Sequence, residues 1–268
     1  MTLTVTILGC GSSAGVPRVG AGWGACNPHN PKNRRRRCSI LVSRRENGGD
    51  TQLLVDTGPD LREQLLDAEV TKLDAVLYTH EHADHTHGID DLRTLVLTMH
   101  HRLDVYADAH TEALLAERFS YCFSTPEGSN YPPILSLRRL VPGRPLIFDG
   151  AGGAIEVLPV RVRHGEIDAL GFRFNGGTGA IAYIPDVGSV PEESLVPLRR
   201  LEVLVLDALR YSPHPSHFSV DDALDLIGRV APRRAVLTDL HADLDYDALA
   251  ARLPAGIEPA YDGMRITL

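Results

Sequence analysis

Cysteine is scarce in this sequence, and its four cysteines form no CxxC pair. Cys10, Cys26, Cys38 and Cys122 are spread singly, which argues against a disulfide framework and against a zinc site built from thiolates. Free thiols suit a reducing compartment, so we expect a cytoplasmic protein. For the same reason we expect no structural zinc in the loop around Cys26.

Long apolar runs and excess positive charge are also lacking. No apolar segment reaches membrane-spanning length, and the start, MTLTVTILGCG, has neither the basic nor the long apolar region of a signal peptide. We therefore expect no membrane association. Lysine and arginine number 27 against 35 acidic residues, a formal net charge of -8. Broad nucleic-acid binding needs a basic surface, so we expect no extended nucleic-acid partner.

What the sequence does contain is an alternation of apolar strand-like and helix-like segments. LTVTILGCG, LDAVLYTH and AIAYIPD read as strands, and SVDDALDLIGRV reads as a helix with Ser219 at its N-cap. HTEALLAERFSYCF reads as one helix, and residues 124–136 as a long surface loop. Two β-rich halves with helices outside predict an α/β fold, a four-layer αβ/βα sandwich, in one domain over residues 1–268.

The stretch LYTHEHADHTHG, from Leu77 to Gly88, concentrates histidines directly after an apolar run. His80, His82, Asp84 and His85 offer imidazole nitrogens and a carboxylate, which suit zinc, manganese or iron. The absence of nearby cysteine favours a hydrolytic site over a structural one. Two metal ions could share this loop, because His80 and His82 precede the turn while Asp84 and His85 follow it.

Two metal ions need more donors than this loop supplies. Each of three further residues follows an apolar strand: His164 in VRVRHGE, Asp186 in AYIPDVG and His241 in LTDLHAD. A carboxylate such as Asp186 can bridge two cations at the separation of about 3.5–4 Å that binuclear hydrolases use. The sequence therefore predicts a metal centre built from several strand ends.

The motif THEHADH resembles the HxHxDH signature of the metallo-β-lactamase superfamily, and the order of the later donors fits along nearly the whole chain. The resemblance implies the αβ/βα sandwich and two divalent ions, Zn or Mn. It places His80, His82 and His164 on the first ion, Asp84, His85 and His241 on the second, with Asp186 bridging. One position departs from the pattern: relatives have histidine directly after the strand threonine, where this chain has Asp239. We favour His241 as the last ligand, with Asp239 as the alternative.

Four other segments narrow the resemblance. GCGSSAGVPRVG, NPHNPKNRRRRCS, HGIDDLR and PHPSHFSVDDAL are similar to the phosphodiesterase branch that contains the phosphoribosyl cyclic phosphate phosphodiesterases. This branch implies a small cyclic or nucleotide-like phosphodiester substrate, attacked by a hydroxide that bridges the two ions. The matching histidine, His217, then acts on the substrate side as a catalytic residue, with His214 as a competitor. Asp84 also orients the nucleophile, and relatives commonly pair as homodimers.

Other features leave the assignment open. The run Arg34 to Arg37 offers cations for a phosphodiester, but such a run equally caps a strand or solvates a surface. Backbone amides of the Gly11 to Gly15 loop could also face a phosphate. The alternatives are a tRNA 3′-processing-type nuclease, a thioester or lactone hydrolase, and a non-catalytic nucleotide-sensing module.

Overall fold

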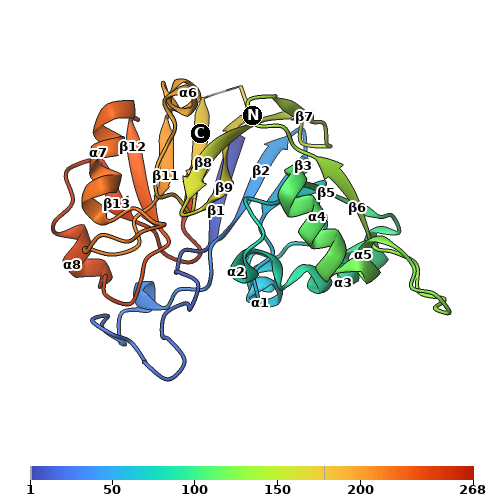
Figure 1. The fold of residues 1–268 in the computed structure, drawn as a ribbon. Helices are drawn as coiled ribbons and strands as arrows, with labels where there is room; N and C mark the ends of the chain where they lie inside the picture. The colour runs from blue at the N-terminus through green and yellow to red at the C-terminus, as the bar shows by residue number, and fades with distance from the viewer. Residues whose placement is uncertain (1, 178) are drawn as a thin grey trace.

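The computed structural model describes residues 2–177 and 179–268, and in it two seven-stranded sheets lie against each other with helices on both outer sides (Figure 1). The first sheet takes most of its strands from the N-terminal half and the second from the C-terminal half. In spatial order the first sheet contains β14 (Arg265–Thr267), β1 (Thr2–Gly9), β2 (Ser39–Glu46), β3 (Gly49–Val55), β4 (Ala75–Leu77), β5 (Leu103–Ala107) and β6 (Leu135–Arg139).

The second sheet mirrors this arrangement. In spatial order it contains β13 (Ile257–Pro259), β12 (Arg234–Thr238), β11 (Val203–Asp207), β10 (Ala180–Ile184), β9 (Ile167–Asn175), β8 (Ile155–His164) and β7 (Leu146–Phe148). Neighbours from β3 to β6 pair in parallel, as do neighbours from β10 to β13. Parallel strands end at the same edge of a sheet, so each half of the molecule collects loops at one edge.

Helices cover the outer face of each sheet. The first sheet is covered by α1 (Leu61–Asp67), η2 (Ile89–Asp91), α3 (Leu92–Met99), α4 (Ala109–Arg118) and α5 (Ser120–Phe123), while α2 (Ala83–Thr86) lies at the end of the sheet. Beside the second lie α6 (Glu192–Leu195), η3 (Val196–Leu198), α7 (Val220–Val230) and α8 (Tyr246–Ala250), and η1 (Pro31–Asn33) lies in the long loop after β1. No helix in the described ranges is both long and apolar enough to cross a bilayer.

Three apolar clusters fill the spaces between the four layers. The central one joins the inner faces of the two sheets, for example Val5 and Val42 from the first with Phe172 and Val205 from the second. The other two join each sheet to its own helices. The predicted four-layer αβ/βα sandwich is confirmed.

The predicted N-cap of one helix is confirmed, whereas the predicted extent of another helix and of one strand is wrong. Ser219 caps α7 in a capping box with Asp222, as its position predicts. The single helix expected over HTEALLAERFSYCF is instead divided into α4 and α5, because Phe119 adopts φ -123°, outside the helical region. The predicted strand LDAVLYTH is also shorter than expected, since β4 ends at Leu77 and the chain turns toward the histidine cluster.

Candidate metal centre

The ends of several strands bring predicted donors, and one carboxylate that was not predicted, Asp207, to one place between the sheets. His80 follows β4, His164 is the last residue of β8, and Asp186 follows β10. Asp207 ends β11 and Asp239 comes directly after β12. Residues far apart in the sequence therefore meet because their strands end at the same edge.

Hydrogen bonds between two loops hold the histidine cluster in shape. Thr57 donates its N–H to the carbonyl of His85 at 2.7 Å, and Gly88 donates to the carbonyl of Thr57 at 2.7 Å. Gly58 lies so close to this turn that an added Cβ would come 2.2 Å from the carbonyl oxygen of Asp84. Only glycine fits at this position while the turn keeps its shape.

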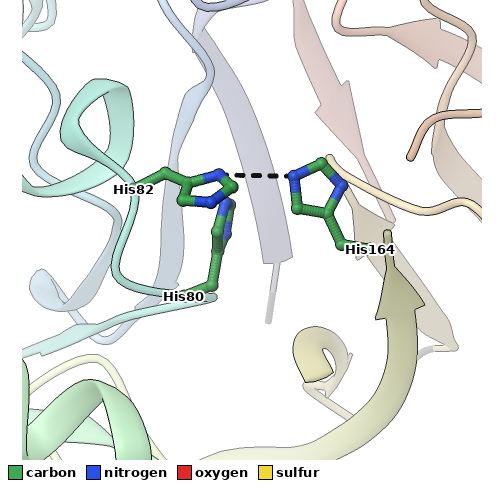
Figure 2. Close-up of side chains that lie close together, drawn as sticks. All are labelled: His80, His82 and His164. Carbon is green, nitrogen blue, oxygen red and sulfur yellow. Dashed lines mark hydrogen bonds between the residues drawn. The ribbon is translucent and has the colours of Figure 1, made fainter. Parts of the chain in front are cut away.

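Three imidazoles form one group of donors, whose ligand atoms all lie within 4.8 Å of one another: His80, His82 and His164 (Figure 2). Nε2 of His164 lies 3.3 Å from Nδ1 of His82, the pair joined by the dashed line in the figure. Nδ1 of His164 donates to the carbonyl oxygen of Ser216 at 2.7 Å. The proton of the neutral ring is therefore on Nδ1, and Nε2 has a free lone pair. Burial lowers the pKa of His80 and of His164, so both rings stay neutral and able to ligate.

Asp186 lies between these three imidazoles and a second group of donors, which is formed by His85 and Asp84. Its Oδ2 is 3.9 Å from Nε2 of His80 and 3.8 Å from Nε2 of His164, while its Oδ1 is 3.2 Å from Nε2 of His85. Burial would raise the pKa of Asp186, but the imidazoles of His85, His80 and His217 hold it well below its usual value. The carboxylate is therefore ionised, with one oxygen toward each group.

His85 is oriented by a carboxylate that sequence reasoning missed. Its Nδ1 lies 2.8 Å from Oδ2 of Asp56, and its Nε2 lies 3.4 Å from Oδ2 of Asp84. Asp56 is fully buried after β3 and also accepts from the N–H and hydroxyl of Thr79, each at 2.8 Å. The only sequence signal was an acidic residue directly after a strand, in LLVDTG.

His217 is oriented in the same way by a second missed carboxylate. Its Nδ1 donates to Oδ2 of Asp207 at 2.9 Å, and its Nε2 lies 3.9 Å from Oδ2 of Asp186. Burial opposes the charge on this ring, but Asp207 and Asp239 raise the pKa of His217 to about 11. His214, the competing histidine, instead has its Nδ1 3.2 Å from the hydroxyl of Ser216.

The structure does not bring His241 into these groups. Its Nε2 lies 2.7 Å from a guanidinium nitrogen of Arg18, and its Nδ1 lies 3.1 Å from Oδ2 of Asp243. Asp239, the alternative, groups with Asp207 and His217, and its Oδ2 is 3.2 Å from Nδ1 of His217. The geometry therefore gives no support to His241 as a ligand of the second ion.

The remaining donors pass a simple test for divalent cations. Nε2 of His80, Nε2 of His85 and Oδ1 of Asp186 are buried atoms without a hydrogen-bond partner. The last two lie 3.2 Å apart, but without hydrogen-bond geometry. Buried polar atoms are normally satisfied, so orphaned nitrogen and oxygen atoms that converge in this way fit metal ligands.

A cavity of about 450 Å³ opens onto this centre, and its lining includes His82, Asp84 and Asp186 as well as Arg18 and Arg210. Three arginines of the run Arg34 to Arg37 contact partners within the protein and do not line this cavity. Arg35 is buried and bonds to carbonyl oxygens, and Arg36 and Arg37 pair with acidic residues: Asp262 and Asp67 for Arg36, Asp60 for Arg37. The cation that faces the cavity from the first loop is therefore Arg18, which sequence reasoning passed over.

Two solved structures resemble this chain in fold. The crystal structure of a new diphosphatase from the PhnP family matches with a TM-score of 0.87 and 35% identity, covering 100% of this chain and 98% of that chain. The short form of human tRNase Z matches with a TM-score of 0.67 and 17% identity, covering 98% of each chain, which shows a shared fold alone.

Two curated proteins match in sequence. Octanoyltransferase of Porphyromonas gingivalis (strain ATCC BAA-308 / W83) is 35% identical over 263 residues, 96% of this chain and 50% of that protein. Ribonuclease Z of Bradyrhizobium sp. (strain ORS 278) is 31% identical over 147 residues, 54% of this chain and 46% of that protein. The chain thus spans about half the length of the curated relatives it matches. The beta-lactamase superfamily domain matches residues 51–239, and the chain therefore belongs to the metallo-β-lactamase superfamily.

Proposed function

We propose that this chain is a dinuclear metal-dependent phosphodiesterase that acts on small cyclic or nucleotide-like phosphodiesters. The position of Asp186 carries the proposal, because its two oxygens face two separate groups of donors. His80, His82 and His164 would hold one ion, and Asp84 and His85 the other. When bound, zinc or manganese ions supply positive charge that activates water and neutralises phosphoryl oxygens.

The chain's own residues supply the remaining parts of the reaction. Arg18 presents a guanidinium to the cavity, where it can bind an oxygen of the diester. Asp84 lines the same cavity and, besides holding an ion, orients the attacking water. Water adds to phosphorus while the bond to the leaving oxygen breaks.

His217 is the proposed general acid. Asp207 fixes its Nδ1, so that Nε2 faces the metal centre and carries the transferable proton. Its raised pKa of about 11 keeps this proton in place at neutral pH until the leaving oxygen accepts it. His214 bonds to Ser216 and lacks a buried carboxylate of this kind among its described contacts.

The size and charge of the site support a small phosphorylated substrate. A cavity of about 450 Å³ is typical of a small-ligand site. The diphosphatase that matches at 35% identity acts on phosphate groups by its own description, which favours phosphorus over a thioester or lactone carbonyl. Octanoyl transfer, the activity named for one relative, is not carried over, because this chain matches only half of that protein.

The second candidate function is RNA processing. The match to a ribonuclease Z at 31% identity favours it, while the net charge of -8 opposes binding of a long RNA. A defined tRNA precursor with a 3′ trailer distinguishes the two: the proposal expects a small cyclic diester to be cleaved far faster than the precursor.

Hydrolysis of bis(p-nitrophenyl) phosphate and p-nitrophenyl phosphate, by protein reconstituted with manganese or zinc, tests the proposal. We expect metal-dependent cleavage of the diester with little attack on the monoester. Silence toward both, with metal demonstrably bound, would move the assignment to a thioester or lactone hydrolase. Silence toward those substrates as well would leave the nucleotide-sensing module.

A further inference from the structure

The side chain of Arg18 is held in the cavity by one histidine. Nη1 of Arg18 lies 2.7 Å from Nε2 of His241, and both residues line the cavity beside the candidate metal centre. A guanidinium has hydrogen-bond donors and no acceptor, so Nε2 of His241 is the acceptor. A neutral imidazole has one donor and one acceptor nitrogen, and the proton of His241 is therefore on Nδ1.

The other contacts of His241 fix the orientation of its ring. Nδ1 lies 3.1 Å from Oδ2 of Asp243, so the ring donates to this carboxylate while it accepts from Arg18. The main-chain N–H of His241 donates to the carbonyl of Leu209 at 2.9 Å, and its carbonyl accepts from the buried Arg35 at 3.3 Å. These contacts keep Nε2 turned toward Arg18.

The hairpin that carries Arg18 gives its side chain little other support. The N–H and carbonyl of Arg18 pair with the carbonyl and N–H of Gly22, both at 2.8 Å. The tip of this hairpin is open to solvent, because Val19 is fully exposed and nothing lies within 4 Å of the Cβ position of Gly20. Among the described residues, His241 is the only one whose side chain hydrogen-bonds to Arg18.

The nature of this partner leaves the charge of Arg18 uncompensated. Arg36 pairs with Asp67 at 2.7 Å and Arg37 with Asp60 at 2.8 Å, and each carboxylate opposes the positive charge. In residues 2–177 and 179–268 no carboxylate pairs with Arg18. A neutral imidazole fixes one nitrogen of the guanidinium and leaves its charge and its other N–H groups available to an anion.

We infer that His241 is a positioning residue for substrate binding, which holds the uncompensated guanidinium of Arg18 toward the cavity so that it binds a phosphoryl oxygen. This inference rests on the proposed function, in which the substrate is a phosphodiester anion. It gives His241 a role in place of the metal-ligand role that the sequence predicted. The diester is already charged before it reacts, so loss of this contact raises KM more than it lowers kcat.

Steady-state hydrolysis of bis(p-nitrophenyl) phosphate by the metal-loaded protein tests the inference. We expect Arg18→Ala to raise KM by about tenfold to a hundredfold, the range for a hydrogen bond to a charged group. His241→Ala keeps the guanidinium but leaves it less well held, so KM should rise by about twofold to tenfold. The double variant should be no worse than Arg18→Ala alone, because His241 acts through Arg18. Effects that multiply in the double variant would overturn the inference.

Two further replacements separate the holding of Arg18 from the compensation of its charge. His241→Gln supplies an amide oxygen as acceptor and should keep KM near its original value. His241→Glu also accepts from Arg18 but compensates its charge, so KM should rise at least as far as in His241→Ala. A glutamine variant no better than the alanine variant, or a glutamate variant with the original KM, counts against the inference.

Two controls exclude other roles for His241. His29→Ala removes an exposed imidazole from the same long loop as Arg18 and should leave KM unchanged. The metal content of His241→Ala, measured by inductively coupled plasma mass spectrometry, should equal that of the unaltered protein. Loss of an ion in His241→Ala would make His241 a ligand and contradict the inference.

Binding of inorganic phosphate to the same metal-loaded variants, measured by calorimetry, separates this inference from the proposed function. We expect weaker binding in Arg18→Ala and His241→Ala, and the original affinity in His241→Gln. If the unaltered protein cleaves no diester but phosphate binding follows this order, the proposed function fails and the positioning role stands. If the protein cleaves the diester and every variant binds phosphate equally, the positioning role fails and the proposed function stands.

Discussion

Oδ2 of Asp207 lies 2.9 Å from Nδ1 of His217, so a fully buried carboxylate at the end of β11 fixes where the opposite ring nitrogen points. That nitrogen, Nε2, lies 3.9 Å from Oδ2 of Asp186. The imidazole of His217 therefore lies between the buried carboxylate of Asp207 and the carboxylate of Asp186 in the candidate metal centre. In the proposed function, Asp186 would hold metal and His217 would act on the substrate.

Replacing His217 tests its proposed action on the substrate. We expect His217→Ala to retain its metal and to lower kcat by a factor of about 10² to 10⁴, the usual contribution of a positioned acid or base. His214→Ala is the matched control and should change kcat by much less. Metal content and steady-state kinetics on the diester check both variants; a His217→Ala enzyme with full activity would remove this residue from the reaction.

Replacing Asp207 tests whether this carboxylate positions the imidazole of His217, because the substitution leaves the imidazole itself unchanged. Asp207→Asn keeps the size of the side chain but loses the charge that holds Nδ1–H, so we expect a lower kcat with metal content unchanged. Because a positioning residue does not bind substrate, KM should stay close to its original value. A rise in KM with kcat unaltered would place Asp207 in substrate binding instead.

Replacing Asp186 tests the metal side. Its oxygens face His80 and His164 on one side and His85 on the other, so Asp186→Ala should lose bound metal and activity together. Inductively coupled plasma mass spectrometry after gel filtration measures the first, and diester hydrolysis the second. A variant that keeps two ions per chain would contradict the assignment of Asp186 as the shared ligand.

The loop that carries Gly58 should be intolerant of even one added carbon. In Gly58→Ala the Cβ would meet the carbonyl oxygen of Asp84 at 2.2 Å, so the turn must shift; we expect a loss of about 1–3 kcal/mol in the free energy of unfolding. Gly228→Ala is the control, since nothing lies within 4 Å of its Cβ position in α7, and it should stabilise by about 0.5–1 kcal/mol. Denaturant unfolding with metal present measures both, and equal midpoints would contradict the close approach.

Arg35 should matter for folding rather than for substrate. Its side chain is 2% exposed, and it donates to the carbonyl of Leu244 at 2.7 Å and of His241 at 3.3 Å. Removing it would leave buried carbonyls unsatisfied, at about 1–3 kcal/mol for each group. We expect Arg35→Ala to unfold at clearly lower denaturant concentration, and Arg34→Ala, at an exposed position, to resemble the original protein. Similar midpoints for the two variants would argue against this structural role.

The sequence predicted the parts of the site whose signal is local. His80, His82, Asp84 and His85 stand in one short motif, and His164 and Asp186 each follow an apolar strand. The fold was predictable for the same reason, because the apolar periodicity of each strand and helix is visible within a short segment of the sequence. These features need no knowledge of distant contacts.

The rest depended on tertiary contacts that no short segment encodes. Asp56 and Asp207 are single acidic residues after strands, and only the fold shows that each meets a histidine. Nor does any short segment show that Arg18, far away in the sequence, places its guanidinium against His241, the favoured candidate for the last ligand. Likewise, the sequence left open whether the run of arginines contacts a phosphate or serves the fold, and only the tertiary structure shows Arg35 buried among carbonyl groups.

The most direct test of the proposed function is the rate of bis(p-nitrophenyl) phosphate hydrolysis measured against the number of ions bound per chain. The account predicts no diester cleavage by the metal-free protein, cleavage that rises as the second ion binds, and little attack on p-nitrophenyl phosphate throughout. A protein with both ions bound that cleaves neither compound would contradict it.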